Sequence, residues 1–362
     1  MSSPPAGLPA TPVHDDFARL VEHYAAHHRP LPWRQTRDPY AILVSEVMLQ
    51  QTRVETVLPY YDRFLARFPD WAALAAAEEP ELLAAWSGLG YYRRARNLQA
   101  VAREVLARGG RLPEEEEELR ALPGLGPYTA ASVASIAFGR PAVALDGNAW
   151  RVLLRYFGIL DDPTRPAVRR ALVDRVRPAI PPARAGEFTQ AVMELGATLC
   201  PPSGEPRCLL CPLAGGCRAR AGGLTSRIPP PRKRKPTEQV QRAAAVLVRD
   251  GRVLLTRDQR AGLLEGLWEC PGVDVPPGRK PLEALEAGLG ALDLRARLSH
   301  LGEVRHAITF RDIRCQVFRG EPEGPGLPGE DRAWVERERL DGWPLPSSTR
   351  RILEQAGELP GR

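Results

Sequence analysis

Two carboxyl side chains in this sequence are placed where acid–base chemistry becomes possible. The first, Glu46, lies in DPYAILVSEVMLQQT, residues 38–52. On a helix, its face is shared by Ile42, Leu43 and Leu49. An ionised carboxylate on an apolar face is costly, so Glu46 is expected to keep its proton near neutral pH, as a general acid must. The alternative is an exposed helix end with a glutamate of no special role.

The second carboxyl, Asp146, lies in VALDGNAWRVLLR, residues 143–155, between an apolar run and a predicted helix. An aspartate at such a point most often caps the helix N-terminus. It also directly follows a predicted helical hairpin at residues 122–139, and this placement favours a functional carboxylate. The local pattern leaves both interpretations open.

That hairpin, LPGLGPYTAASVASIAFG, predicts a helix, a Gly-x-Gly turn and a second helix. Gly124 and Gly126 permit a positive φ and a close approach of the backbone. The second helix would present free backbone N–H groups to an anion such as phosphate. The flanking Leu-Pro and Tyr-Thr-Ala-Ala make the pattern far more specific than a lone Gly-x-Gly.

Four of the six cysteines crowd into one short segment with the spacing C-x7-C-x2-C-x5-C. They are Cys200, Cys208, Cys211 and Cys217. Such a cluster in a protein without a secretory signal indicates metal binding rather than disulfides. The spacing suits a tetrahedral zinc or a [4Fe–4S] cube and does not choose between them. Cys270 and Cys315 stand apart and are expected to be small buried hydrophobic residues.

Composition indicates a polyanionic partner. The chain has 362 residues, a length for two or three modules, and a formal net charge of +6. Only Lys233, Lys235 and Lys280 are lysines; the other basic residues are arginines, which grip phosphate but cannot act as amine nucleophiles. No apolar stretch reaches the roughly 18 residues of a membrane span, and the N-terminus is polar and proline-rich. We therefore expect a cytoplasmic protein without membrane attachment.

The periodicity of apolar residues divides the chain into parts. Residues 1–15 are expected to be a disordered tail, and residues 16–199 follow helical spacing broken by Pro or Gly. The cysteine loop, residues 200–217, and a basic Pro- and Gly-rich linker, residues 218–239, come next. Residues 240–362 predict a second, smaller α+β domain.

Strand signals mark this second domain. Asp250-Gly251 stands between two apolar runs and predicts a β-hairpin. TRRILEQA, near the end of the sequence, predicts a closing helix.

Taken together, these motifs resemble the MutY family of adenine DNA glycosylases, within the helix-hairpin-helix glycosylase superfamily. The resemblance runs from about residue 16 to 220 and, more weakly, from 240 to the end. The motifs that carry it are LPWR (31–34), SEVMLQQTRVETV (45–57), WSGLGYYRRARNL (86–98), LPGLGPYTA (122–130), ALDGNAWRV (144–152), MELGATLC (193–200) and the cysteine run. The resemblance implies a mainly α helix-hairpin-helix domain with an iron–sulfur cluster loop, and a small α+β Nudix-like domain at the C-terminus.

The resemblance also implies roles for individual residues. Glu46 corresponds to the acid that protonates the adenine ring, and Asp146 to the carboxylate that stabilises the cationic sugar. Tyr128 and Asn148 correspond to residues beside them. The residues implied in DNA binding are Arg34, Leu49, Gln51, Tyr91, Gly124, Gly126 and Thr129, of which Gln51 and Tyr91 would wedge into the duplex. The four clustered cysteines correspond to the ligands of a [4Fe–4S] cluster.

The implied function is base-excision repair. The enzyme would flip out adenine mispaired with 8-oxoguanine or guanine in double-stranded DNA, and hydrolyse its glycosidic bond. The two carboxyls would need opposite protonation states, so their surroundings should push their pKa values apart. We expect a monomer that associates with the nucleoid by binding DNA.

Two rival functions remain. An endonuclease III-like glycosylase and AP lyase would need an amine near the sugar. The lyase lysine corresponds to Tyr128, and residues 16–199 contain no lysine. A lesion-binding protein without activity would keep the hairpin and lack one of the carboxyls.

The sequence departs from the family pattern in two places. Seven residues separate Cys200 from Cys208, where the family usually has six. The recognition loop often reads Phe-Ser-His; here Ile308 would keep the wedge and Thr309 the hydroxyl, as the lesion-recognition residues, and the His is missing. The second domain also lacks the glutamate-rich metal-binding box of a Nudix hydrolase, so we expect no nucleotide hydrolysis.

Overall fold

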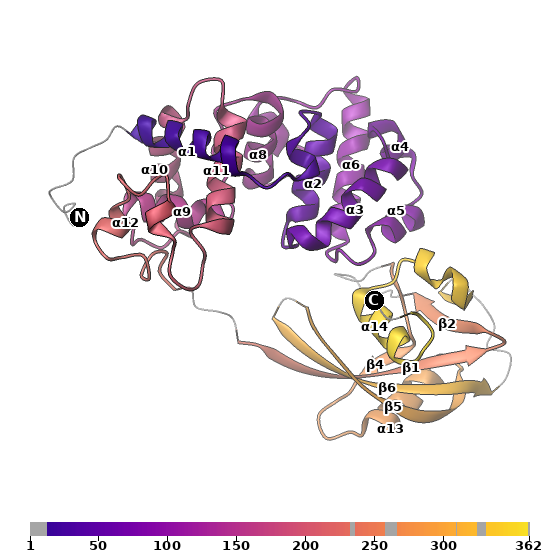
Figure 1. Ribbon diagram of the computed structural model, residues 1–362. Helices are drawn as coiled ribbons and strands as arrows, with labels where there is room; N and C mark the ends of the chain where they lie inside the picture. The colour runs from indigo at the N-terminus through magenta and orange to yellow at the C-terminus, as the bar shows by residue number, and fades with distance from the viewer. Residues whose placement is uncertain (1–12, 232–235, 258–265, 309, 324–330, 361–362) are drawn as a thin grey trace. The chain divides into compact units, whose positions relative to one another are not determined.

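The computed structural model describes residues 13–231, 236–257, 266–308, 310–323 and 331–360 (Figure 1). They belong to two compact units. The first unit comprises Met1–Ala75 and Asn97–Lys233; the second comprises Ala76–Arg96 and Arg234–Arg362. Every helix in the described ranges is too short or too polar to cross a lipid bilayer.

The first unit is helical, as the sequence predicts. Helix α1 begins at Val13, so residues 13–15, expected in the tail, are helical; Asp15 and Asp16 in its first turn favour this start. The other helices wholly or partly in this unit are η1 (Pro32–Arg34), α2 (Pro39–Leu49), α3 (Val54–Arg67), α4 (Trp71–Ala76), α6 (Arg93–Ala107), α7 (Glu116–Arg120), α8 (Pro127–Phe138), α9 (Gly147–Phe157), α10 (Pro166–Val176), η2 (Arg177–Ala179), α11 (Ala185–Thr198), η3 (Cys208–Leu210) and α12 (Arg218–Ala221).

One core joins α1, α9 and α11. Phe17 of α1 packs on Phe188 of α11 with ring centroids 4.7 Å apart, and Leu153 of α9 lies in the same cluster. This packing fixes the start of α9 beside α11.

Helix α2 has buried side chains all round. Every residue from Tyr40 to Met48 is buried, which is the pattern of a helix that runs through a core rather than along a surface. Asp38 caps its N-terminus by accepting from the backbone N–H groups of Tyr40 and Ala41, and Pro39 occupies the first helical position. Glu46 therefore lies on a helix whose whole circumference is buried.

The predicted hairpin is formed by α7, a turn and α8. Gly124 adopts φ 71°, and a Cβ there would lie 2.1 Å from the Asn97 amide nitrogen. The positive φ and the close approach of the backbone therefore both require a glycine. Gly126 differs from the expectation: it is extended at φ −76°, caps α8 and has open space around it. Pro127 follows as the first residue of α8.

Residues 218–231, predicted as linker, pack against the first unit instead. Ala219 and Ile228 are buried in its core, and Arg155 Nε donates to the Ile228 carbonyl at 2.8 Å. These scattered apolar residues anchor a segment whose composition is otherwise that of a linker. Residues 232–235 lie outside the described residues.

The second unit contains a seven-stranded sheet in its described part, with the order β3-β2-β1-β6-β5; β4 pairs with β1 and β7 with β2. Strands β1 and β6 are parallel, and the other pairs are antiparallel. Its elements are α5 (Glu79–Trp86), β1 (Glu238–Arg249), β2 (Arg252–Arg257), β3 (Trp268–Glu269), β4 (Gly272–Asp274), α13 (Pro281–Gly290), β5 (Arg295–Ile308), β6 (Arg311–Glu323), β7 (Arg332–Glu336), η4 (Arg337–Gly342) and α14 (Ser347–Gln355).

Helices cover both faces of this sheet (Figure 1). Alternate residues of β1 belong to two separate cores, one containing Leu285 of α13 and the other Leu353 of α14. This explains why β1 reads as a continuous apolar run. The predicted β1–β2 hairpin is confirmed, with Asp250 at φ 49° and Gly251 at φ 71°.

The two isolated cysteines lie in the α14 core of this sheet. Cys270 is 3% exposed and Cys315 is 1% exposed. The expectation that they are small buried hydrophobic residues is confirmed.

Candidate active site

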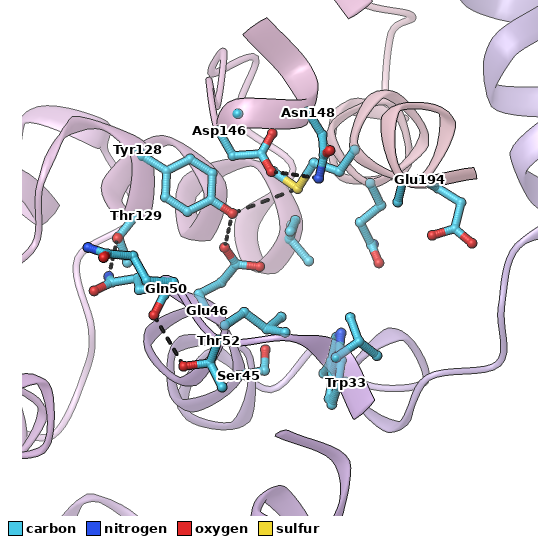
Figure 2. A pocket seen from close by; sticks show the side chains of 18 of the residues that line it. Trp33, Ser45, Glu46, Gln50, Thr52, Tyr128, Thr129, Asp146, Asn148 and Glu194 are labelled. Carbon is cyan, nitrogen blue, oxygen red and sulfur yellow. Dashed lines mark hydrogen bonds between the residues drawn. The ribbon is translucent and has the colours of Figure 1, made fainter. Parts of the chain in front are cut away.

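A cavity of about 910 Å³ lies in the first unit, lined by α2, α8, α11 and the start of α9 (Figure 2). The predicted site residues that line it are Arg34, Glu46, Leu49, Gln51, Gly124, Gly126, Tyr128, Thr129, Asp146 and Asn148. The fold thus brings together residues that are far apart in the sequence.

Glu46 reaches the cavity from α2 and is 5% exposed. The Tyr128 hydroxyl donates to Glu46 Oε2 at 2.8 Å (Figure 2). Burial raises the pKa of Glu46; hydrogen bonds from Tyr128 and Ser132 oppose this, and the nearby Asp146 charge adds to it. Glu46 is thus buried, as expected, and burial acts on its pKa in the expected direction.

Tyr128 itself stays neutral. Burial raises the pKa of its hydroxyl well above the ordinary value, and the charges of Glu46 and Asp146 raise it further. Its oxygen also lies 3.7 Å from the Met193 sulfur. The phenol therefore acts as a hydrogen-bond donor to the carboxyl.

Asp146 both caps a helix and lines the cavity. Its Oδ1 accepts from the Ala149 backbone N–H at 2.6 Å, as the N-cap of α9, and its Oδ2 accepts from Asn148 Nδ2 at 3.2 Å (Figure 2). Burial raises the pKa of Asp146, and these donors together with Arg151 oppose the rise. Burial therefore acts in the same direction on both carboxyls, contrary to a simple separation of their pKa values.

Asn148 is fixed by its neighbours. Arg151 Nη2 donates to Asn148 Oδ1 at 2.8 Å, and the same guanidinium donates to the carbonyls of Gly147, Gly196 and Cys200. Helix α11 also approaches closely: a Cβ on Gly196 would lie 2.6 Å from Asn148 Cβ and 3.0 Å from its Cα. Backbone contact with α11 therefore sets the position of the loop that carries Asp146.

Glu194 adds a third carboxylate to the cavity wall, which the sequence reasoning missed. It accepts from Arg29 Nη2 and from Arg34 Nη2, each at 2.7 Å. Burial raises the pKa of Glu194, but the hydrogen bonds and charges of the arginines outweigh it and lower the pKa to about 2. The motif MELGATLC contains this residue, and only the partners across the fold reveal its role.

Arg34, predicted to bind DNA, has a side chain that is only 7% exposed. Its guanidinium also donates to the Arg29 carbonyl at 3.0 Å and lies 5.4 Å from the centre of the Tyr24 ring. In this structure the Arg34 side chain is part of the cavity wall.

Two adjacent glutamines differ in placement. Gln50 Nε2 donates to Thr129 Oγ1 at 2.9 Å (Figure 2). Gln51 is instead exposed and adopts φ 57°. Both line the cavity. The sequence reasoning singled out Gln51 and missed Gln50, because the turn after Leu49 decides which of them faces α8.

Three of the predicted residues belong to the second unit. Tyr91 adopts φ 48°, and its ring centre lies 5.5 Å from the Arg94 guanidinium carbon. Ile308 ends β5 and is partly buried. Thr309 lies outside the described residues.

The four clustered cysteines line a second cavity of the first unit, together with Arg155. Arg155 Nη1 donates to Cys200 Sγ at 3.1 Å. Within the described ranges, no three His, Cys, Asp or Glu side chains are close enough together to hold one metal ion. A tetrahedral zinc needs all its ligands on one ion, whereas each thiolate of a [4Fe–4S] cube binds a different iron. Four thiols on one cavity are the donor set that a [4Fe–4S] cluster requires.

Comparisons with known proteins agree with this architecture. Residues 44–178 match the HhH-GPD superfamily of base excision DNA repair proteins, and residues 243–355 match the NUDIX domain. A solved thermostable thymine-DNA glycosylase is 29% identical and superposes with a TM-score of 0.53 over 58% of this chain and 97% of its own.

Two curated relatives show the family. The adenine DNA glycosylase of Homo sapiens is 35% identical over an alignment of 407 residues. The alignment covers 94% of this chain and 74% of the human protein. That of Rattus norvegicus is 38% identical over 363 residues, covering 84% of this chain and 70% of the rat protein. The chain therefore belongs to the adenine DNA glycosylase family, with a helix-hairpin-helix glycosylase domain followed by a Nudix-like domain.

Proposed function

We propose that this member of the family removes adenine mispaired with 8-oxoguanine or guanine from double-stranded DNA, by hydrolysis of the glycosidic bond. The observation that carries the proposal is the pair of carboxyls, buried Glu46 and partly buried Asp146, on the wall of one cavity of purine-binding size. The helical fold alone does not fix the base, since the similar solved structure is a thymine-DNA glycosylase. The choice of adenine follows the curated relatives.

The reaction uses the two carboxyls in different protonation states. The target nucleotide leaves the stack and enters the cavity, at an unstacking cost that a mispair reduces. Protonated Glu46 gives its proton to a ring nitrogen of adenine while the bond from the base to the sugar carbon breaks, with the electron pair leaving on the base. Ionised Asp146 stabilises the cationic sugar. A water oxygen then bonds to that carbon and gives a proton to the Glu46 carboxylate, which restores the acid.

Neighbouring groups stabilise the charge that each carboxyl would carry in this reaction. The Tyr128 hydroxyl donates to Glu46 and so stabilises the carboxylate that remains after proton transfer. Asp146 accepts from the Ala149 backbone N–H and the Asn148 amide, which favour its ionised form.

Hydrolysis rather than a Schiff base is the expected outcome. A lyase intermediate needs an amine at the sugar, and residues 16–199 contain no lysine. Tyr128 stands at the position where the lyase family has its lysine. The rival endonuclease III-like function therefore lacks its nucleophile.

The cysteine cavity and the second domain complete the proposal. Cys200, Cys208, Cys211 and Cys217 would hold a [4Fe–4S] cluster, with Arg155 as a donor to one thiolate. When bound, the cluster supplies a rigid cross-link among the four thiolates and a centre able to change its redox state. Ile308 and Thr309 are proposed to sense the oxidised guanine opposite the adenine.

The test is a single-turnover reaction on a duplex with adenine opposite 8-oxoguanine, followed by alkali to reveal abasic sites. Glu46→Gln should slow adenine release by about a hundredfold or more, the usual contribution of general acid catalysis. Glu104→Gln is the matched control, because Glu104 is partly exposed on α6 and pairs only with Arg108 among its described ion-pair partners.

Three outcomes would contradict the proposal. If Glu46→Gln releases adenine at the wild-type rate, Glu46 is not the general acid. Strand cleavage without alkali, with a borohydride-trapped adduct, indicates the lyase. No release of adenine by cluster-loaded wild type indicates a lesion-binding protein.

A further inference from the structure

Ser132 is a buried hydroxyl that the mechanism so far does not use. It lies four residues after Tyr128 on α8, one helical turn along the same face, and is 0% exposed. In the described part of the chain its Oγ is inaccessible and forms no hydrogen bond of regular geometry. A buried polar group in this condition is costly and calls for an explanation.

A second serine on α8 shows the ordinary arrangement. Ser135, also fully buried, has its Oγ 2.8 Å from the Ala185 carbonyl, to which it donates, and 2.6 Å from Thr189 Oγ1. Ser132 has no such partner, so helix packing alone does not account for it.

The polar groups that interact with the Ser132 hydroxyl are the Glu46 carboxyl and the Tyr128 hydroxyl. The Ser132 interaction lowers the pKa of Glu46, in the same direction as the hydrogen bond from Tyr128. The other charged groups facing Glu46 are Asp146, which raises its pKa, and Arg34, which lowers it. Ser132 and Tyr128 are therefore two neutral hydroxyls near the Glu46 carboxyl that favour its ionised form.

Ser132 does not line the cavity, whereas Glu46 and Tyr128 do. Because its Oγ is also inaccessible, we expect Ser132 to act through Glu46 and not by contact with the base.

We propose that Ser132 is a positioning residue whose hydroxyl donates to Glu46 after the proton has passed to adenine. A protonated carboxyl is itself a donor, while a carboxylate only accepts and has room for several donors. The Ser132 hydroxyl can rotate, so it is unsatisfied in the resting site and satisfied once charge develops on Glu46. An interaction that is stronger after proton transfer lowers the barrier, because it stabilises the transition state more than the ground state.

This inference rests on the proposed role of Glu46 as the acid, so its test includes a measurement that does not. The carboxyl of Glu46 is titrated directly, by carbon NMR of glutamate-labelled protein or by its infrared band, assigned with Glu46→Gln. Ser132→Ala should raise the pKa of Glu46. An unchanged pKa overturns the proposal whether or not Glu46 proves to be the acid.

The second measurement is the single-turnover rate against pH. Because protonated Glu46 is the active form, a higher pKa moves the alkaline limb of the profile of Ser132→Ala to higher pH. The plateau rate should fall, by about threefold to tenfold, since one donor is lost from the transition state. A structural role alone would lower the rate without moving the limb, and that result would also overturn the proposal.

Two further variants keep the test decisive. Ser132→Cys nearly preserves the volume but is a weak donor, so it should shift the limb in the same direction even if the alanine variant folds poorly. Ser135→Ala is the matched control: it removes a buried hydroxyl from the same helix away from Glu46, and should leave the limb unmoved. A shift in Ser135→Ala equal to that of Ser132→Ala would overturn the proposal.

Discussion

Helices α2 and α9 each present a carboxyl to the same cavity, but they hold it in different ways. Glu46 lies inside α2, where the helix uses the nearby backbone groups, and its donor at hydrogen-bond distance is the Tyr128 side chain. Asp146 precedes the first turn of α9 and accepts from the Ala149 backbone N–H. Burial raises the pKa of both carboxyls.

The difference lies in what opposes burial. A backbone N–H is a fixed donor that cannot turn away, so it favours the ionised form of Asp146 at all times. A hydroxyl donates or accepts according to its partner, so it tolerates either form of Glu46. Position within a helix therefore decides which kind of donor opposes burial at each carboxyl, and this difference supports the proposed roles of Glu46 as the acid and Asp146 as the charged group.

The largest expected effect comes from variants that remove the charge of Asp146 and either keep or lose its helix cap. Asparagine caps a helix about as well as aspartate, so Asp146→Asn should keep stability and slow adenine release by about a hundredfold or more. Asp146→Ala should lose the same activity and also about 1 kcal/mol of unfolding free energy. Single-turnover rates and urea unfolding measure the two effects. An Asp146→Asn variant with near wild-type rates would remove the electrostatic role.

Glu194, the third carboxyl on the cavity wall, extends the comparison. At this residue charged arginines are the main groups that oppose the effect of burial on the pKa. Hydrogen bonds from Arg29 and Arg34 hold the pKa of Glu194 at about 2, below its value in an unfolded chain. Its stabilising contribution is therefore complete above about pH 4.3 and is lost as the pH falls towards 2. Glu194→Gln should lower the free energy of unfolding by on the order of 3 kcal/mol at pH 7, because it leaves buried charge unpaired.

The measurement is urea unfolding at pH 7 and near pH 3. The deficit of Glu194→Gln should shrink at the lower pH, where wild type has lost part of the same contribution. Glu187→Gln is the control: its pair with Arg184 is partly exposed and should contribute little. A deficit that does not change with pH would contradict the ionised state of Glu194.

The smallest expected effect tests the side-chain donor of Glu46. Tyr128→Phe removes a hydrogen bond that lowers the pKa of Glu46, so that pKa should rise. The alkaline limb of the rate profile should then move to higher pH, with a plateau rate reduced by about tenfold or less. A limb that moves to lower pH would show that the hydroxyl opposes the carboxylate.

Sequence reasoning identified the residues whose local pattern is distinctive. The apolar face around Glu46, the cysteine spacing and the Asp250-Gly251 turn depend on neighbours in the chain, and the structure confirms the burial of Glu46 and the turn. For Asp146 the structure shows a helix cap and also a place on the cavity wall, so the two interpretations do not exclude each other.

Other features depend on packing between distant helices. Glu194 meets Arg29 and Arg34 only when α11 lies beside the N-terminal segment. Ser132 reads as one more small residue of a buried helix until α2 is placed against it. No local pattern contains this information, so these residues could not be found from the sequence.

The close approach of Gly196 to Asn148 has a genetic consequence. The atoms that a new side chain would meet include the Asn148 Cα and carbonyl oxygen, and not the end of a flexible side chain. A strain carrying Gly196→Ala should therefore yield few intragenic suppressors, since exchanging neighbouring side chains cannot clear backbone atoms. True reversion to glycine should dominate among recovered repair-proficient colonies.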